Sequence, residues 1–183
     1  MAGERGAGQG GAVGLTITEA DGTRPAVLAR AAARGVLGGL VGAAATAAAQ
    51  RAERAITGRP ASAVPGRTLL ILLGRHPGDD EHPAAATLAA QVATSAALGA
   101  LRGVWRASGL LRVRADVAQT LTRVIVDQTL QNATGAGAPP RTWHRGEGVV
   151  EVLHAAVDAV VTGLVVENLV EPVLESRRGT TSH

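Results

Sequence analysis

The segment from Glu147 to Leu174 has the reverse of the pattern expected for the surface helix of a soluble protein. At a helical spacing of about 100° per residue, its polar positions fall within roughly 80° of one another: Glu151, His154, Asp158 and Thr162. Almost every other position in its central turns is Val, Leu or Ala. A soluble surface helix instead has one apolar stripe and is polar elsewhere. The narrow polar stripe favours a helix that faces lipid outside and a polar interior inside.

Two earlier segments also approach the ~20 residues that a helix needs to cross a bilayer. Residues 35–50 carry no charge, and the stems of Arg30 and Arg34 just before them can lie along apolar surface. Residues 83–101 are likewise uncharged. A weaker segment, 111–131, holds charged residues among its Val, Leu and Ile, including Asp116, Arg123 and Asp127. We therefore predict four helices in sequence, over residues 25–57, 83–106, 111–131 and 147–174.

The remaining segments have the composition of connections and tails. Within 58–82, the apolar run 68–74 is too short to span a membrane and predicts an interfacial turn of helix or a buried plug. Residues 132–141 are rich in Gly and Pro and predict a loop. We expect one helical domain over 23–175, between flexible tails at 1–22 and 176–183. The first tail lacks a basic region followed by an apolar one, so we expect no secretory signal there.

Glycines recur on one face of the first predicted helix. Each glycine in the middle of a helix costs about 1 kcal/mol relative to alanine unless close packing compensates. In a bilayer, small residues compensate by letting two helix backbones approach each other. We predict this close packing at Gly35, Gly38, Gly39 and Gly42, and at Gly99 and Gly103 in the second helix.

The composition excludes several classes of protein. The chain has no Cys, which excludes disulfide scaffolds, thiolate nucleophiles and Cys-ligated metal sites. It has no Phe or Tyr, and it is rich in Ala, which argues against a β-sandwich or barrel. All 18 basic residues are Arg, but 15 acidic residues are spread among them. We therefore expect no nucleic-acid partner.

Several short motifs resemble the YagU-type family of small bacterial inner-membrane proteins. They are AERAITGRP at 52–60, GALRGVW at 99–105, Asp127, GAGAPPRTWH at 135–144 and EVLHAAVDAV at 151–160. The resemblance spans about residues 30–168. It implies a four-helix fold in the bacterial cytoplasmic membrane, and it implies no reaction because the family has none assigned. The family's second helix carries a His followed by Gly at four-residue steps, whereas this chain has Gln91, Ser95, Gly99 and Gly103.

The polar stripe is the first candidate site. Glu151, His154 and Asp158 would face the interior, and Arg123 and Asp127 of the third helix are spaced to pair with each other and could be their partners. Titratable groups inside a membrane are costly and tend to be functional, which suggests a proton or ion relay. A satisfied network that only holds the third and fourth helices together is the alternative. We find no nucleophile with an adjacent base, so we expect no enzyme and no cofactor.

The second candidate lies just before the second predicted helix. Two His and three carboxylates within residues 76–83 could hold a divalent cation, with His76, Asp79, Asp80 and His82 as the ligands. The alternative is a solvated loop whose carboxylates stabilise the positive end of the following helix.

Together these patterns predict an all-α, four-helix transmembrane bundle with Gly- and Ala-mediated close packing. Its expected partners are the lipid bilayer, further copies of the chain or other membrane proteins. The only two Trp, Trp105 and Trp143, fall beside predicted helix ends, where an aromatic belt would lie. The distribution of Arg leans toward both termini inside. There are two alternatives: a soluble Ala-rich helical module that oligomerises, and a metal-binding helical protein.

Overall fold

The computed structural model describes residues 23–78, 80–138 and 145–173. These ranges contain five helices and no strand: α1 (Arg24–Thr57), α2 (Val64–Leu72), α3 (Ala84–Ala107), α4 (Arg112–Thr134) and α5 (Arg145–Leu169). The all-α prediction is confirmed. The predicted count of four is wrong, because the short apolar run near residue 70 belongs to a helix of its own. The two predicted tails, 1–22 and 176–183, lie outside the described residues.

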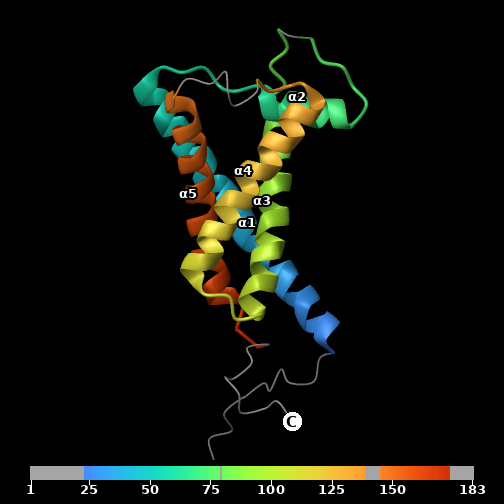
Figure 1. Cartoon of the computed structure of the whole chain (residues 1–183), viewed down its shortest axis with the longest axis vertical. Helices are drawn as coiled ribbons and strands as arrows, with labels where there is room; N and C mark the ends of the chain where they lie inside the picture. Colours follow the sequence, from blue (N-terminus) through green and yellow to red (C-terminus); the bar gives the residue numbers. More distant parts are fainter. Residues whose placement is uncertain (1–22, 79, 139–144, 174–183) are drawn as a thin grey trace, which may run out of the picture.

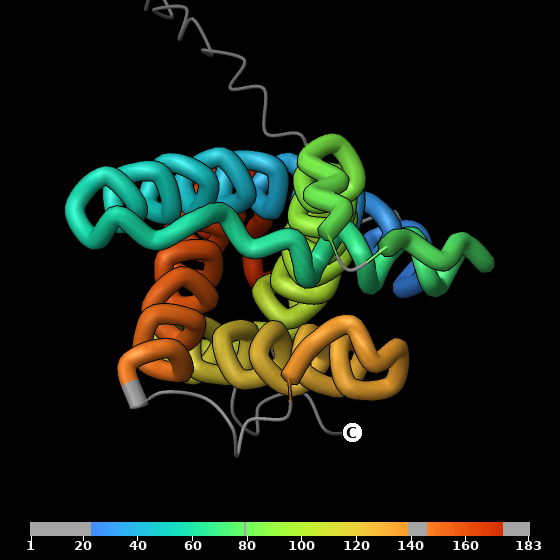
Figure 2. Tube along the Cα trace, turned by 90° about the horizontal axis from the view of Figure 1, so that it is seen from above, coloured from blue at the N-terminus to red at the C-terminus, as the bar shows by residue number. Residues whose placement is uncertain are grey.

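The four long helices alternate in direction along the bundle (Figure 1). The carboxyl ends of α1 and α4 and the amino ends of α3 and α5 therefore meet at one end, beside α2; we name it the α2 end, and the opposite end the far end. Viewed from above, α1 and α4 lie on opposite sides, with α3 and α5 between them (Figure 2). Helix α1 packs along both α3 and α5, and α4 packs mainly on α5.

Helix α2 is short and is fixed to α3 by a close backbone approach. Pro65 stands in its first turn, where the missing N–H of proline costs nothing. Gly66 and Thr68 are buried. A Cβ on Gly66 would lie 2.8 Å from the carbonyl oxygen of Pro83, at the start of α3. We predicted an interfacial turn of helix or a buried plug for this run. The structure shows a helix attached to one end of the bundle.

Helix α5 ends at Leu169, five residues before the predicted boundary at Leu174. Pro172 follows, and a proline cannot continue the hydrogen-bond ladder of a helix. Two arginines satisfy the last carbonyls: Arg34 donates to the oxygen of Leu169 and Arg106 to the oxygen of Val170, each at 3.3 Å. Cations are favoured at this end of a helix. The other boundaries lie within three residues of their predicted positions.

The glycines of α1 divide between two neighbouring helices. Gly35 and Gly39 face α3, where a Cβ on Gly35 would lie against the carbonyl oxygen of Gly99. Gly38 and Gly42 face α5, where a Cβ on Gly42 would lie 3.0 Å from the carbonyl oxygen of Asp158. The backbones of α1, α3 and α5 are therefore in direct contact, which only residues without a side chain permit.

The largest buried side chains of the bundle are mostly polar. Five of its six largest fully buried side chains are polar: Arg102, Gln119, Thr162, Asp158 and Ser95, with Val166 as the sixth. The outside of α4 carries aliphatic side chains at every fourth residue, and the first of them, Val113, is 72% exposed; the others are Val117, Leu121 and Ile125. Helix α5 exposes Val152, Leu153, Val160 and Leu164 in the same way.

Three of the described helices are long and apolar enough to cross a membrane: α1, α3 and the part of α5 from Gly146. Helix α4, which contributes charged side chains to the interior, falls outside that set. Trp105 is half-buried in the last turn of α3, and Trp143 lies outside the described residues.

Candidate functional site, a buried ion-pair cluster beneath a cavity

An ion-paired cluster joins α3, α4 and α5 near the middle of the bundle; we name its five residues the central cluster: Ser95, Gln119, Arg123, Asp127 and Asp158. The guanidinium of Arg123 lies between two carboxylates. Its Nη1 is 3.1 Å from Oδ2 of Asp158, and its Nε is 3.5 Å from Oδ2 of Asp127. Asp158 is completely buried, at 0% exposure, so this pair is shielded from solvent.

Further hydrogen bonds hold the Asp158 carboxylate in place. The Ser95 hydroxyl donates to Oδ1 of Asp158 at 2.7 Å and accepts from Nη1 of Arg123 at 2.7 Å. Gln119 donates from Nε2 to the other oxygen of Asp158 at 3.4 Å. We expected a seam between the segments 111–131 and 147–174 alone. That expectation was too narrow, since Ser95 places α3 in the same network.

The other two residues of the predicted stripe lie nearer the α2 end. Glu151 accepts a hydrogen bond from Nε2 of Gln128 at 2.9 Å. His154, one turn further along α5, is half-buried. Among the described residues, no hydrogen bond joins either of them to Asp158. The structure therefore places Arg123, Asp127 and Asp158 together and sets Glu151 and His154 above them.

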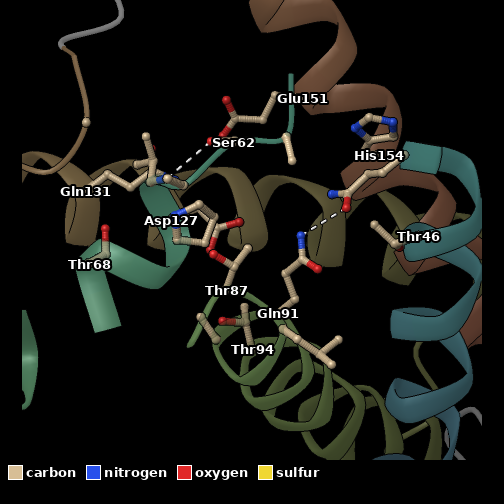
Figure 3. A pocket seen from close by; sticks show the side chains of 18 of the residues that line it. Thr46, Ser62, Thr68, Thr87, Gln91, Thr94, Asp127, Gln131, Glu151 and His154 are labelled. Atoms are coloured by element: carbon tan, nitrogen blue, oxygen red, sulfur yellow. Dashed lines mark hydrogen bonds between the residues drawn. The ribbon is translucent and has the colours of Figure 1, made fainter. Parts of the chain in front are cut away.

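A cavity of about 900 Å³ occupies the α2 end, with walls from all five helices (Figure 3). Asp127, Glu151 and His154 line it, and so does Arg123 of the central cluster. Gln91 of α3 donates to Oε1 of Gln50 of α1 at 3.0 Å along another side of this cavity. Asp158 lies behind Arg123. The cavity thus reaches one face of the buried ion pair.

A second group of charged side chains lies toward the far end; we name it the far cluster: Arg102, Asp116, Arg112 and Glu167. Arg102 is only 2% exposed and forms an ion pair with Asp116. Arg112 lies 3.9 Å from Asp116 and 3.5 Å from Glu167. The absence of a side chain at Gly163 makes room for the Arg102 guanidinium.

The sequence reasoning missed Arg102, Ser95 and Gln119 as interior residues, although their spacing contains a signal. Ser95 and Arg102 lie seven residues apart on one face of α3 and flank Gly99. Gln119 lies four residues before Arg123 on one face of α4. Each interior polar residue therefore shares a helix face with a residue that the sequence did single out.

The candidate metal ligands before α3 are solvent-exposed where the structure describes them. His76, Asp80 and His82 are exposed, and Asp79 lies outside the described residues. Nδ1 of His82 lies 2.8 Å from the backbone oxygen of Asp80. In the described ranges no three His, Cys, Asp or Glu side chains gather as a metal site would need.

Comparisons with family models, with curated proteins and with solved structures found no match to this chain. The resemblance to the YagU-type family stays a prediction. In the central cluster an arginine is shared between two carboxylates, and a hydroxyl bridges donor and acceptor. Such a set can exchange a proton or hold a cation where water reaches it.

Proposed function

We propose that the chain is a multi-pass integral membrane protein. The observation that carries the proposal is the inverted packing: charged and amide side chains are among the largest buried groups, while aliphatic side chains are exposed on the outside of α4 and α5. Water would penalise this arrangement, whereas lipid favours it, because a bilayer solvates Val and Leu and excludes charge. The aliphatic face of α4 supports placing this helix in the bilayer as well, with its charges turned inward.

We further propose that the polar interior is a minor pathway for protons or small ions. The cavity admits solvent as far as Arg123 and Asp127. Asp158 and Ser95 continue the polar line inward, and the far cluster continues it toward the opposite end. Ionisable groups along the axis of a membrane bundle are typical of such pathways. A purely structural role, in which the same ion pairs hold α3, α4 and α5 together, is the competing function.

Proton flux into liposomes tests this pathway. Vesicles that contain the full chain and a pH-sensitive dye should acidify faster than empty vesicles after an external acid pulse. Asp158→Asn should lower the added rate by about tenfold or more, because it removes the exchangeable carboxyl. His154→Ala should also lower it. Glu171→Gln, at an exposed residue beyond α5, serves as the control. Unchanged flux in folded Asp158→Asn and His154→Ala protein would leave only the structural role.

A further inference from the structure

The cavity at the α2 end has the size and the walls of a ligand site. Its volume of about 900 Å³ lies within the range of small-molecule pockets in proteins. Aliphatic side chains form much of its wall, among them Leu69, Leu88 and Val150. A mostly apolar wall with a few polar groups is the usual composition of such pockets.

Charge is distributed unevenly along this cavity. At its deep end one guanidinium, that of Arg123, faces three carboxylates: those of Asp127 and Asp158, both paired with it, and that of Glu151. The neutral amide of Gln128 is the hydrogen-bond donor to Glu151. These four ionisable groups together carry an excess of two formal negative charges, with Asp158 behind Arg123 and the other three on the cavity wall.

The other arginines that line the cavity lie toward its mouth, where carboxylates accompany them. Arg59 lies 3.8 Å from Glu53 and 3.7 Å from Glu147, between the end of α1 and the start of α5. Arg54 and the exposed Arg51 belong to the last turns of α1, on the same side. The mouth thus has three guanidiniums and two carboxylates, and the negative excess at the deep end stays in place.

Two buried hydroxyls on the cavity wall provide an independent observation. Thr46 of α1 is 3% exposed and Thr68 of α2 is 6% exposed. Both line the cavity (Figure 3), and neither hydroxyl oxygen has a hydrogen-bond partner among the described residues. Buried polar atoms are nearly always paired, so unpaired ones beside a cavity point to a group that is bound there.

We propose that this cavity binds a hydrophobic organic cation, with its positive charge against Asp127 and Glu151 and its apolar part against the aliphatic wall. The inference rests on the proposed membrane function and deepens it, because it assigns a class of substrate to the polar interior. The negative excess selects a cation, and the wall selects one that carries apolar groups. The threonine hydroxyls could accept hydrogen bonds from an ammonium group.

Tetraphenylphosphonium and tetraphenylborate test the proposal, because the two ions share one shape and carry opposite charges. Binding is measured by equilibrium dialysis on the full chain, recovered from membranes and held in lipid nanodiscs, with empty nanodiscs subtracted. We expect saturable binding of the phosphonium, and weaker or no saturable binding of the borate. The double variant Asp127→Asn, Glu151→Gln should lower phosphonium affinity by about tenfold or more.

Glu147→Gln is the matched control, because it removes one carboxylate from the mouth; it should change affinity by no more than about twofold. Circular dichroism confirms that each variant is folded. Non-saturable phosphonium binding, borate binding at equal or higher affinity, or a double variant that binds like the wild type would each overturn the proposal. Because the protein comes from membranes, such a result would contradict the ligand assignment and not the membrane location.

Discussion

Gly39→Ala is expected to destabilise the protein by about 3 kcal/mol, although it adds a single methyl group. The new Cβ would lie against the carbonyl oxygen of Ser95 and 3.1 Å from the Cα of Ala96. Both obstacles belong to the backbone of α3, so no change of rotamer relieves the clash and α1 must move away from α3. The Ser95 hydroxyl would shift with its backbone and weaken its bond to Asp158. Thermal unfolding of the purified protein, followed by circular dichroism, measures the loss.

Gly146→Ala is the matched control for this prediction. Gly146 lies in α5, and a Cβ there meets no atom within 4 Å among the described residues. The same chemical change should therefore stabilise the helix, by up to about 1 kcal/mol, through alanine's higher helix propensity. If the two variants unfold at the same temperature, α1 and α3 are not in the backbone contact described above.

Arg123→Met is expected to cost about 3–5 kcal/mol, because it leaves the Asp158 carboxylate buried without its cation. Ser95 and Gln119 would still donate hydrogen bonds to Asp158, but neither carries a charge. Adding Asp158→Asn in the same chain should recover most of the loss, because a neutral amide no longer needs a counter-charge. The free energy of unfolding of the two single variants and the double variant measures this coupling.

The exposed ion pair of the far cluster provides the control. Arg112, at 43% exposure, lies 3.5 Å from Glu167, so Arg112→Met should cost no more than about 1 kcal/mol. The account of the central cluster is wrong if Arg123→Met is tolerated as well as Arg112→Met. It is also wrong if Asp158→Asn fails to improve the stability of the Arg123→Met chain.

Helical periodicity was sufficient to predict which face of the last helix turns inward. Asp158 and Thr162 are fully buried while Val160 and Leu164 are exposed, which follows from the positions of polar residues around one helix. The glycine spacing in α1 likewise predicted a close approach, but it could not name the partners. Two of the four glycines contact α3 and the other two contact α5, and this division depends on how the three helices meet in space.

Other features were not predictable from single segments. Arg102 stands near the end of an apolar helix, where an arginine usually extends to the membrane surface, and its inward direction depends on the space at Gly163. The run at α2 was too short for a periodicity argument, so its helical state depended on Pro65 and on contact with α3. The cavity is formed by side chains from five helices and has no signature in any one of them.

The partition of the full-length protein between membrane and supernatant, without detergent, tests the membrane location most directly. Cells that express the chain are broken, and the high-speed pellet is washed with alkaline carbonate, which strips peripheral proteins. The inverted packing predicts that the chain remains in the washed pellet and dissolves only when detergent is added. Recovery in the detergent-free supernatant, as an oligomer on size-exclusion chromatography, would contradict the membrane location. It would favour a soluble helical module in which copies of the chain cover one another's aliphatic faces.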